Sequence, residues 1–261
     1  MPLSLFALLD HWRSPLPDPR KVDWVSANDY AHRGLHSVGA PENSLAAFAA
    51  AVEQGLGIEL DVQRASDGRA VVFHDATLDR LTAESGPLSR LNAAQLGKVA
   101  LAGTRETIPT LRQVLLQIAG RVPVLVEIKT QRKEHVAALC LAVRRVLEGY
   151  GGPHAVISFD PRVARWFFTH SPHTVRGLTI TEEGSRGLFG AIRRRLSMWY
   201  ARPDFLTYDV RDLPSRFASQ QRTRGLKIVT WTVKTPEDRQ RALAYADISI
   251  VEGEGVAPCA E

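Results

Sequence analysis

Cysteine is scarce in this sequence, with two residues among 261. Cys140 falls at an apolar position of a helical pattern, and Cys259 lies in the tail, so we expect a core thiol and a loose thiol. A disulfide framework and a cysteine-ligated metal site are thereby excluded as the basis of the fold. The hydrophobic share of 44% is ordinary and allows a large apolar core instead.

Long hydrophobic runs, internal repeats, low-complexity tracts and linkers are also missing. No stretch is long and apolar enough to span a bilayer. Residues 1–9 are apolar, but no basic residue precedes them and Asp10 follows at once, unlike a secretory signal. We therefore expect a cytoplasmic protein.

Charge is moderately unbalanced, with 33 basic and 28 acidic side chains and a net charge of +5. Such a surface favours anionic partners, namely phosphate esters, nucleic acid or anionic lipid. The densest basic run is Arg193-Arg194-Arg195, inside the apolar and aromatic segment 187–202. A membrane-surface helix or a phosphate-steering patch is one interpretation. We favour the other, a helix of the fold with a solvated basic face.

Short β-rich runs alternate with longer helical patterns along the chain, which is typical of parallel βα units. Several of the runs are continuously apolar, as expected of strands buried on both faces. We therefore predict an α/β fold, a single-domain TIM (β/α)₈ barrel over residues 30–261, with residues 1–29 as an N-terminal extension. The predicted strands are 30–34, 58–62, 124–129, 155–159, 176–180, 205–209, 228–233 and 248–251.

Helix-start signals support this order. Asn43 and Ser44 precede one run of apolar residues at helical spacing, and Thr110 precedes another. Asp160-Pro161 and Thr235-Pro236 each read as an N-cap followed by proline at the first helical position.

One predicted strand, 71–75, departs from the βα alternation. Only residues 65–68 separate it from the strand before it, too few for a parallel crossover. We predict a β-hairpin with Asp67-Gly68 in the turn, which would carry His74 back over the end of the second strand.

Carboxylates are the first candidate site residues. Glu59 and Asp61 are two apart on one strand and therefore face the same side, and Glu127 and Lys129 repeat this spacing on the next barrel strand. Three converging carboxylates favour a hard divalent cation, Mg²⁺ or Ca²⁺, between them. The alternative is that Lys129 and Arg33 neutralise the carboxylates without a metal.

Histidines complete the candidate site. His32 ends the first strand and His74 ends the hairpin, and two such groups can serve as acid and base near neutral pH. Arg33 can bind a phosphate oxygen through its planar guanidinium. The remaining histidines have no such context and are expected at the surface or at caps: His11, His36, His135, His154, His170 and His173.

These residues belong to a longer series of motifs whose order and spacing resembles the glycerophosphodiester phosphodiesterase family over about residues 30–251. The motifs are His32-Arg33-Gly34, Pro41-Glu42-Asn43-Ser44, Glu59-x-Asp61, Asp67-Gly68, Val72-x-His74-Asp75, Leu78-Asp79-Arg80, Ile108-Pro109-Thr110-Leu111, Glu127-x-Lys129, Ser158-Phe159 and Trp231-Thr232-Val233.

The resemblance implies a TIM barrel with one divalent cation, Ca²⁺ or Mg²⁺, and assigns roles to single residues. It implies metal ligands at Glu59, Asp61 and Glu127, catalytic histidines at His32 and His74, and phosphate contacts at Arg33 and Lys129. Trp231 would line the substrate cleft or simply fill the barrel. Glu42 would support the metal, support His32 or start a helix.

Departures from the family pattern concern substrate identity. Leu81 and Lys234 replace a frequent threonine and asparagine, Ser44 replaces threonine, and the last strand ends Val251-Glu252-Gly253. Segment 82–107 is short where many members insert a small subdomain, so we expect a reduced insertion and a more open mouth.

The function that we predict is metal-dependent hydrolysis of a glycerophosphodiester to glycerol 3-phosphate and an alcohol, with acid–base catalysis by two histidines. Partners would be a small-molecule phosphodiester and, at most, a weak membrane-surface contact, but no nucleic acid. One alternative is a phosphodiesterase that cleaves lysophospholipids at a membrane surface. Another is a non-catalytic anion- or nucleic-acid-binding barrel, supported only by the net charge. The oligomeric state is left open.

Overall fold

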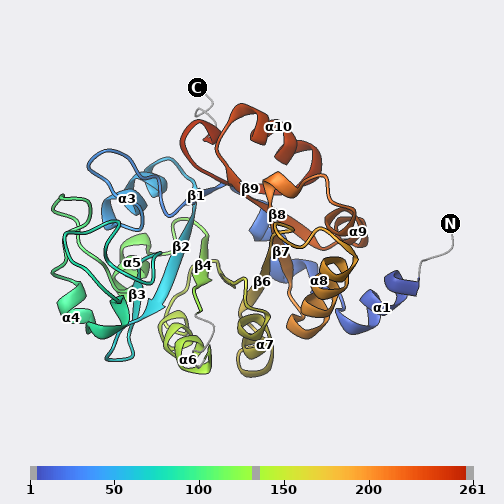
Figure 1. Cartoon of the computed structure of the whole chain (residues 1–261), viewed down its shortest axis with the longest axis horizontal. Coiled ribbons are helices and arrows are strands. Elements are labelled where there is room, and N and C mark those ends of the chain that lie inside the picture. The colour runs from blue at the N-terminus through green and yellow to red at the C-terminus, as the bar shows by residue number, and fades with distance from the viewer. Residues whose placement is uncertain (1–4, 131–135, 257–261) are drawn as a thin grey trace. The chain divides into compact units, whose positions relative to one another are not determined.

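The computed structural model describes residues 5–130 and 136–256, and these residues form two compact units. One unit is residues 30–154, and the other combines the N-terminal residues up to Asp29 with residues 155–256 (Figure 1). Cys259 and His135 lie outside the described residues.

Three parallel strands form the centre of the unit 30–154. They are β1 (Tyr30–His32), β2 (Gly57–Arg64) and β4 (Val124–Ile128), with β2 paired to both of the others. Strand β3 (Ala70–Val72) is antiparallel to β2, and Gly68 in the connecting turn has φ +84°, a conformation that favours glycine. The predicted hairpin is therefore confirmed, although its strand ends at Val72, before His74.

Helices α3 (Leu45–Glu53), α5 (Leu111–Ile118) and α6 (Val136–Leu147) belong to the same unit. Ser44 caps α3 by accepting a hydrogen bond from Ala47 N, and Thr110 forms a capping box with Gln113 at the start of α5. Cys140 lies fully buried in α6, as predicted for the core thiol.

Segment 82–107 shares a small apolar cluster with the β2–β3 hairpin and the residues that follow it. It contains the 3₁₀ turn η2 (Leu88–Arg90) and the short helix α4 (Ala93–Leu96), whose leucines are buried with Phe73 and Leu78. The segment is thus packed against the hairpin that leads to His74, so its core also holds that hairpin in place.

The other unit carries the remaining five parallel strands and four helices that follow them. Asp160 and Thr235 cap the helices that begin with Pro161 and Pro236, as predicted. The strands are β5 (His154–Ile157), β6 (Val175–Ile180), β7 (Phe205–Asp209), β8 (Lys227–Val233) and β9 (Ile248–Val251). The helices are α7 (Pro161–His170), α8 (Leu188–Ala201), α9 (Arg216–Arg224) and α10 (Pro236–Tyr245). The 3₁₀ turns are η3 (Val210–Asp212) and η4 (Gly253–Gly255).

The N-terminal segment packs on this unit through α1 (Leu5–Arg13), α2 (Pro19–Val22) and η1 (Asp23–Ser26). Buried Asp10 accepts hydrogen bonds from Trp199 Nε1 on α8 and Gln221 Nε2 on α9. Lys21 forms an ion pair with Asp204 at 2.8 Å. These contacts hold residues 10–21 against the unit. That residues 1–29 are an N-terminal extension of the barrel domain stays a prediction.

Eight parallel strands alternating with helices, plus one hairpin, constitute the TIM barrel fold, so the predicted fold class is confirmed. Each of the eight predicted barrel strands is present with ends within two residues of those expected, because continuously apolar strands end sharply at polar or glycine residues, whereas the hairpin strand predicted over 71–75 ends three residues early. Within residues 5–130 and 136–256, no helix has the length and apolarity needed to cross a bilayer.

The prediction for the basic run is only half right. Segment 187–202 does contain a barrel helix, α8, capped by Gly187 and Arg202, but its arginines do not make a solvated basic face. Arg194 is 8% exposed and pairs with Glu182, and Arg195 is 14% exposed and pairs with Asp10. Two of the three consecutive charges therefore serve packing within the unit.

Candidate active site

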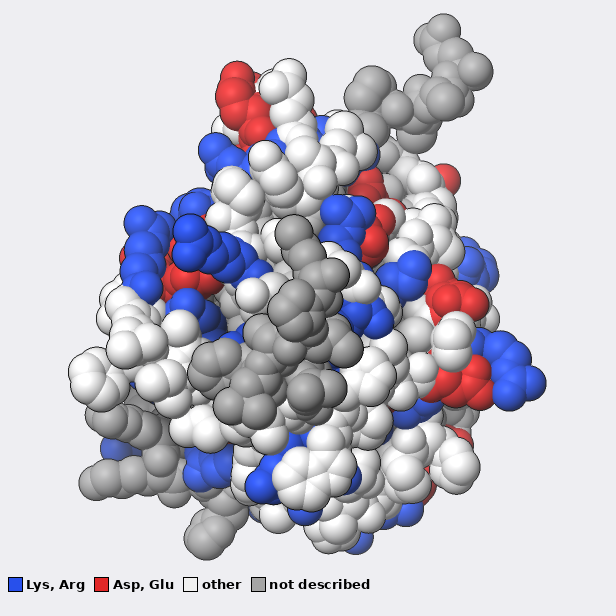
Figure 2. Space-filling view, turned by 90° about the vertical axis from the view of Figure 1, so that its right-hand side faces the viewer, with Lys and Arg blue, Asp and Glu red and all other residues white. Residues whose placement is uncertain are grey.

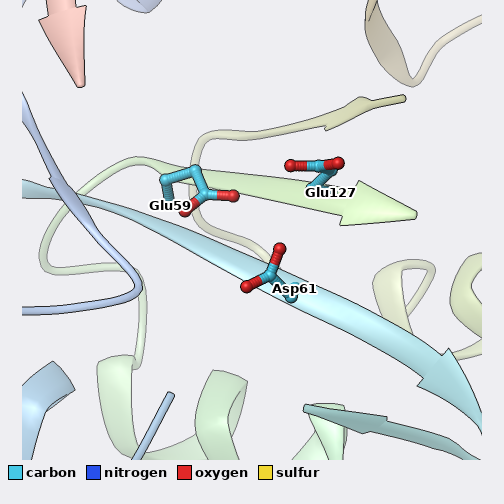
Figure 3. Close-up of side chains that lie close together, drawn as sticks. All are labelled: Glu59, Asp61 and Glu127. Atoms are coloured by element: carbon cyan, nitrogen blue, oxygen red, sulfur yellow. The ribbon is translucent and has the colours of Figure 1, made fainter. Parts of the chain in front are cut away.

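Three buried carboxylates converge between neighbouring strands of the unit 30–154. Glu59 and Asp61 project from β2 and Glu127 from β4, and their carboxylates turn toward one another (Figure 3). Asp61 and Glu127 are register partners, so the strand pairing itself places them side by side. One ligand oxygen of each residue lies within 4.8 Å of those of the other two. The predicted acidic cluster is therefore formed.

Two cations lie against this cluster. Lys129 Nζ lies 2.8 Å from Glu127 Oε1 and 3.0 Å from Asp61 Oδ1. Arg33 Nε lies 3.2 Å from Asp61 Oδ2, and the backbone N–H of Arg33 donates to Glu59 Oε2 at 3.1 Å. Three carboxylates against two cations leave one formal negative charge if all are ionised.

The pKa shifts show which of the three carboxylates the two cations neutralise incompletely. Burial, followed by the charges of Asp61 and Glu127, raises the pKa of Glu59 well above its usual value. Burial also raises the pKa of Glu127, despite its contact with Lys129. Burial alone would raise the pKa of Asp61, but Lys129 and Arg33 lower it to about 2. The glutamates thus bear the uncompensated charge.

This donor set fits a hard divalent cation. It offers carboxylate oxygens alone, which Mg²⁺ and Ca²⁺ prefer, and no cysteine or histidine belongs to the group. A cation among the three carboxylates would favour the ionised form of Glu59 and Glu127, which burial disfavours.

His74 lies at the edge of the cluster and is oriented by its neighbour. Its Nδ1 donates to Asp75 Oδ1 at 2.9 Å, because an ionised carboxylate can only accept, so Nε2 remains for proton exchange. Gln63 Nε2 donates to the backbone carbonyls of Phe73 and Asp75 and so fixes the turn that carries the imidazole. Burial lowers the pKa of His74, while Asp61 and Asp75 oppose this shift.

His32 reaches the site through strand pairing. It is the register partner of Glu59 in the parallel pair β1–β2, so both side chains face the same side of the sheet. Its side chain is half-buried at the end of β1. The pairing thus brings one of the two predicted histidines to the face that carries the carboxylates.

A chain of ion pairs, which the sequence does not predict, links His74 to the carboxylates. Arg80 donates to Asp75 at 2.5 Å and binds Glu42 through both terminal nitrogens at 2.6 and 3.1 Å. Glu42 in turn accepts from Arg33 Nη1 at 2.8 Å. Glu42 therefore orients Arg33, rather than starting a helix. Asp75 and Arg80 belong to the motifs Val72-x-His74-Asp75 and Leu78-Asp79-Arg80, and this is the only signal for them in the sequence.

Asn43 is a second residue whose role was missed. It was read as an N-cap, but Ser44 performs that task. Asn43 has φ +59° in the left-handed region, which asparagine tolerates, and its amide reaches Asp61 instead. Its Nδ2 donates to Asp61 Oδ2 at 2.9 Å, and its Oδ1 accepts from the Asp61 backbone N–H at 3.2 Å. Asn43 thus fixes the central carboxylate.

Trp231 belongs to the other unit, on β8. Its ring packs edge-on against Phe159, with ring centroids 5.3 Å apart. The indole Nε1 is buried and has no hydrogen-bond partner among the described residues. A buried donor without a partner is costly in a purely barrel-filling aromatic, which favours a ligand-facing role.

A TIM barrel whose strand ends gather carboxylates, cations and histidines has the features of a barrel enzyme. Residues 32–251 match the model of the "Glycerophosphoryl diester phosphodiesterase family". The chain belongs to this family, whose enzymes are phosphoric diester hydrolases.

Individual relatives agree with this placement. A glycerophosphodiester phosphodiesterase of Caldanaerobacter subterraneus is 30% identical over 228 residues, covering 82% of this chain and 88% of the relative. Glycerophosphodiester phosphodiesterase 1 of Rattus norvegicus is 26% identical over 98% of this chain and 88% of its own. A solved phosphodiesterase of Oleispira antarctica, in complex with the product sn-glycerol-3-phosphate, has a TM-score of 0.75 at 23% identity, covering 87% of this chain and 92% of that one.

Proposed function

We propose that this chain hydrolyses a glycerophosphodiester to glycerol 3-phosphate and an alcohol, using one divalent cation, Mg²⁺ or Ca²⁺. The observation that carries the proposal is the group of three buried carboxylates, Glu59, Asp61 and Glu127, with ligand oxygens within 4.8 Å of one another. The glycerol 3-phosphate bound to the Oleispira antarctica enzyme supports the substrate class. Membership in a hydrolase family favours this function over a non-catalytic binding barrel.

The three carboxylates would hold the cation, which when bound supplies Lewis-acid polarisation of the phosphoryl group. Arg33 and Lys129 add positive charge beside it and attract the anionic diester. Glu42 holds Arg33 by one terminal nitrogen and thereby sets the direction of its guanidinium.

His32 and His74 would carry the two proton transfers. One histidine removes a proton from the attacking oxygen as the new P–O bond forms, and the other protonates the leaving alkoxide as the old P–O bond breaks. The attacker is water, or the glycerol 2-hydroxyl with a cyclic phosphate that water then opens. Both routes need an acid and a base on the same substrate, and both are compatible with a free Nε2 on His74.

Chelation tests the metal requirement. Turnover of glycerophosphocholine should fall by about a hundredfold or more in excess chelator, because the Lewis acid contributes several kcal/mol of transition-state stabilisation. Added Mg²⁺ or Ca²⁺ should restore it, and the better ion identifies the preferred metal. Full turnover in chelator would show that Lys129 and Arg33 neutralise the carboxylates unaided, and the metal proposal would be wrong.

The pH dependence tests the role of His74. The hydrogen bond to Asp75 raises the pKa of His74, so Asp75→Asn should lower that pKa further. One limb of the kcat/KM profile should therefore move to lower pH. If the acidic limb moves, His74 is the base, and if the basic limb moves, it is the acid. An unmoved profile in a folded variant would remove His74 from proton transfer.

Trp231 would contact the substrate through its unpartnered indole N–H. Trp231→Phe keeps the ring that packs on Phe159 but removes this donor. We expect KM to rise by roughly threefold to tenfold with kcat little changed, since a neutral hydrogen bond contributes about 1 kcal/mol. The matched control is Trp166→Phe on α7. An unchanged KM in Trp231→Phe would mean that Trp231 only fills the barrel.

A further inference from the structure

The outer face of α8 exposes apolar side chains that a barrel helix normally buries. Leu188, Phe189, Ile192, Leu196 and Tyr200 are 75, 88, 43, 54 and 51% exposed. At 3.6 residues per turn these positions fall within an arc of roughly 120° on one side of the helix. The opposite side is buried and includes Gly190, Met198 and Ala201. The helix is thus apolar toward the unit and apolar toward solvent.

The charges of the segment that carries this stripe have a single sign. Residues 184–203 include five arginines and no acidic residue. Arg193 is exposed beside the stripe and has no ion-pair partner among the described residues. At the far end, Arg165 of α7 lies over the Tyr200 ring, 5.9 Å from its centroid. Arginine thus borders the stripe on the helix itself and at its C-terminal end.

A concave basic site adjoins the N-terminal end of the stripe. A cavity of about 620 Å³ is lined there by Leu188, by five arginines and by two carboxylates, Glu182 and Asp212, and four of the arginines are ion-paired with carboxylates. Arg216 is exposed at this cavity and has no ion-pair partner in the described part of the chain. Figure 2 views the chain from the side on which Figure 1 draws α1, α8 and α9, and there blue and white surfaces adjoin while red is confined to smaller areas.

We infer that this surface, the apolar stripe of α8 with the arginine-lined cavity, docks on a bilayer that contains anionic phospholipid. The apolar side chains would enter the acyl boundary, and the exposed Arg193 and Arg216 would meet lipid phosphates at the head-group level. A second copy of this chain fits less well, because a twofold contact through the same face would set arginines against arginines. The inference goes beyond the proposed reaction and does not depend on it.

Vesicle binding by the full chain tests this inference without any measurement of turnover. The chain should sediment with vesicles of phosphatidylcholine and phosphatidylglycerol, but weakly with phosphatidylcholine alone, and salt should reduce the binding. The double variant Leu188→Ser/Phe189→Ser should bind about tenfold more weakly, because each side chain loses apolar burial in the bilayer. Arg216→Glu should also bind more weakly, with a smaller dependence on salt.

The matched control is Leu243→Ser on α10, which removes a leucine of nearly the same exposure, 74%, from the same unit. Its vesicle affinity should equal that of the parent chain, and thermal melts should show that all variants are folded. The inference is overturned by absence of binding to phosphatidylglycerol vesicles, or by equal losses in the control and the double variant. It is also overturned if the parent chain is a dimer in solution that the double variant converts to a monomer.

Discussion

Replacing either His32 or His74 with alanine should lower kcat by about 10² to 10⁴-fold, because each variant loses one of the two proton transfers. KM should change little, since neither imidazole is proposed to supply substrate affinity. The double variant should be scarcely slower than the slower single one, because acid and base act in one reaction and their losses do not add. Steady-state turnover of glycerophosphocholine, in the preferred metal, measures all three variants.

His173→Ala is the control for these substitutions. His173 is exposed between α7 and β6 and has no ion pair or hydrogen bond to the described residues, so its loss should leave kcat unchanged. The melting temperatures of the variants should stay near that of the parent chain, since both histidines are only partly buried. Parent-like kcat in His32→Ala or His74→Ala would contradict the assignment of that histidine.

Strand positions could be predicted closely from the sequence because buried parallel strands have a strong local signal. Runs such as Val124-Leu125-Val126 are apolar on both faces and end at a polar residue, so no knowledge of neighbours was needed. The same alternation placed Glu59 and Asp61 on one face, and the register with β4 then brought Glu127 to Asp61. The carboxylate cluster is thus the part of the site that strand periodicity can reveal.

The residues that orient the site could not be predicted in the same way. Glu42 and Arg80 are 38 positions apart, and both lie outside strands and helices. A loop has no sequence periodicity from which the partner of one of its residues could be predicted. Asn43 precedes a helix, and its left-handed backbone conformation, which turns the amide to Asp61, is set by the fold. The burial of Arg194 likewise depends on Glu182, two residues beyond the end of β6. Polar contacts between separate segments emerge only in three dimensions.

Asp61 is the residue at which those contacts meet, so its replacement should have the broadest effect. It lies against Lys129, Arg33 and Asn43, with 1% of its side chain exposed. Asp61→Asn removes the negative charge and a proposed metal ligand while keeping the shape. We expect kcat to fall by about 10³-fold or more, and metal affinity to fall with it, since a carboxylate ligand is lost.

Stability should fall in the same variant. Lys129 and Arg33 remain beside Glu59 and Glu127, whose raised pKa values mark them as poorer counter-charges. Breaking a buried pair costs about 3–5 kcal/mol, and the partial exposure of both cations reduces this to about 2–3 kcal/mol here. Urea unfolding in chelator would measure the difference without a contribution from bound metal.

The pH dependence separates this charge effect from a packing effect. The pKa of Asp61 is lowered from 3.8 to about 2, so its ionised form stabilises the fold above pH 3.8, and this contribution is lost as the pH falls through about 2. The stability difference between the parent chain and Asp61→Asn should therefore shrink over that interval. Glu53→Gln, an exposed substitution on α3, is the control for exchanging a carboxylate for an amide. A pH-independent loss in Asp61→Asn would mean that the hydrogen bonds and packing of the new amide, rather than the missing charge, destabilise the fold.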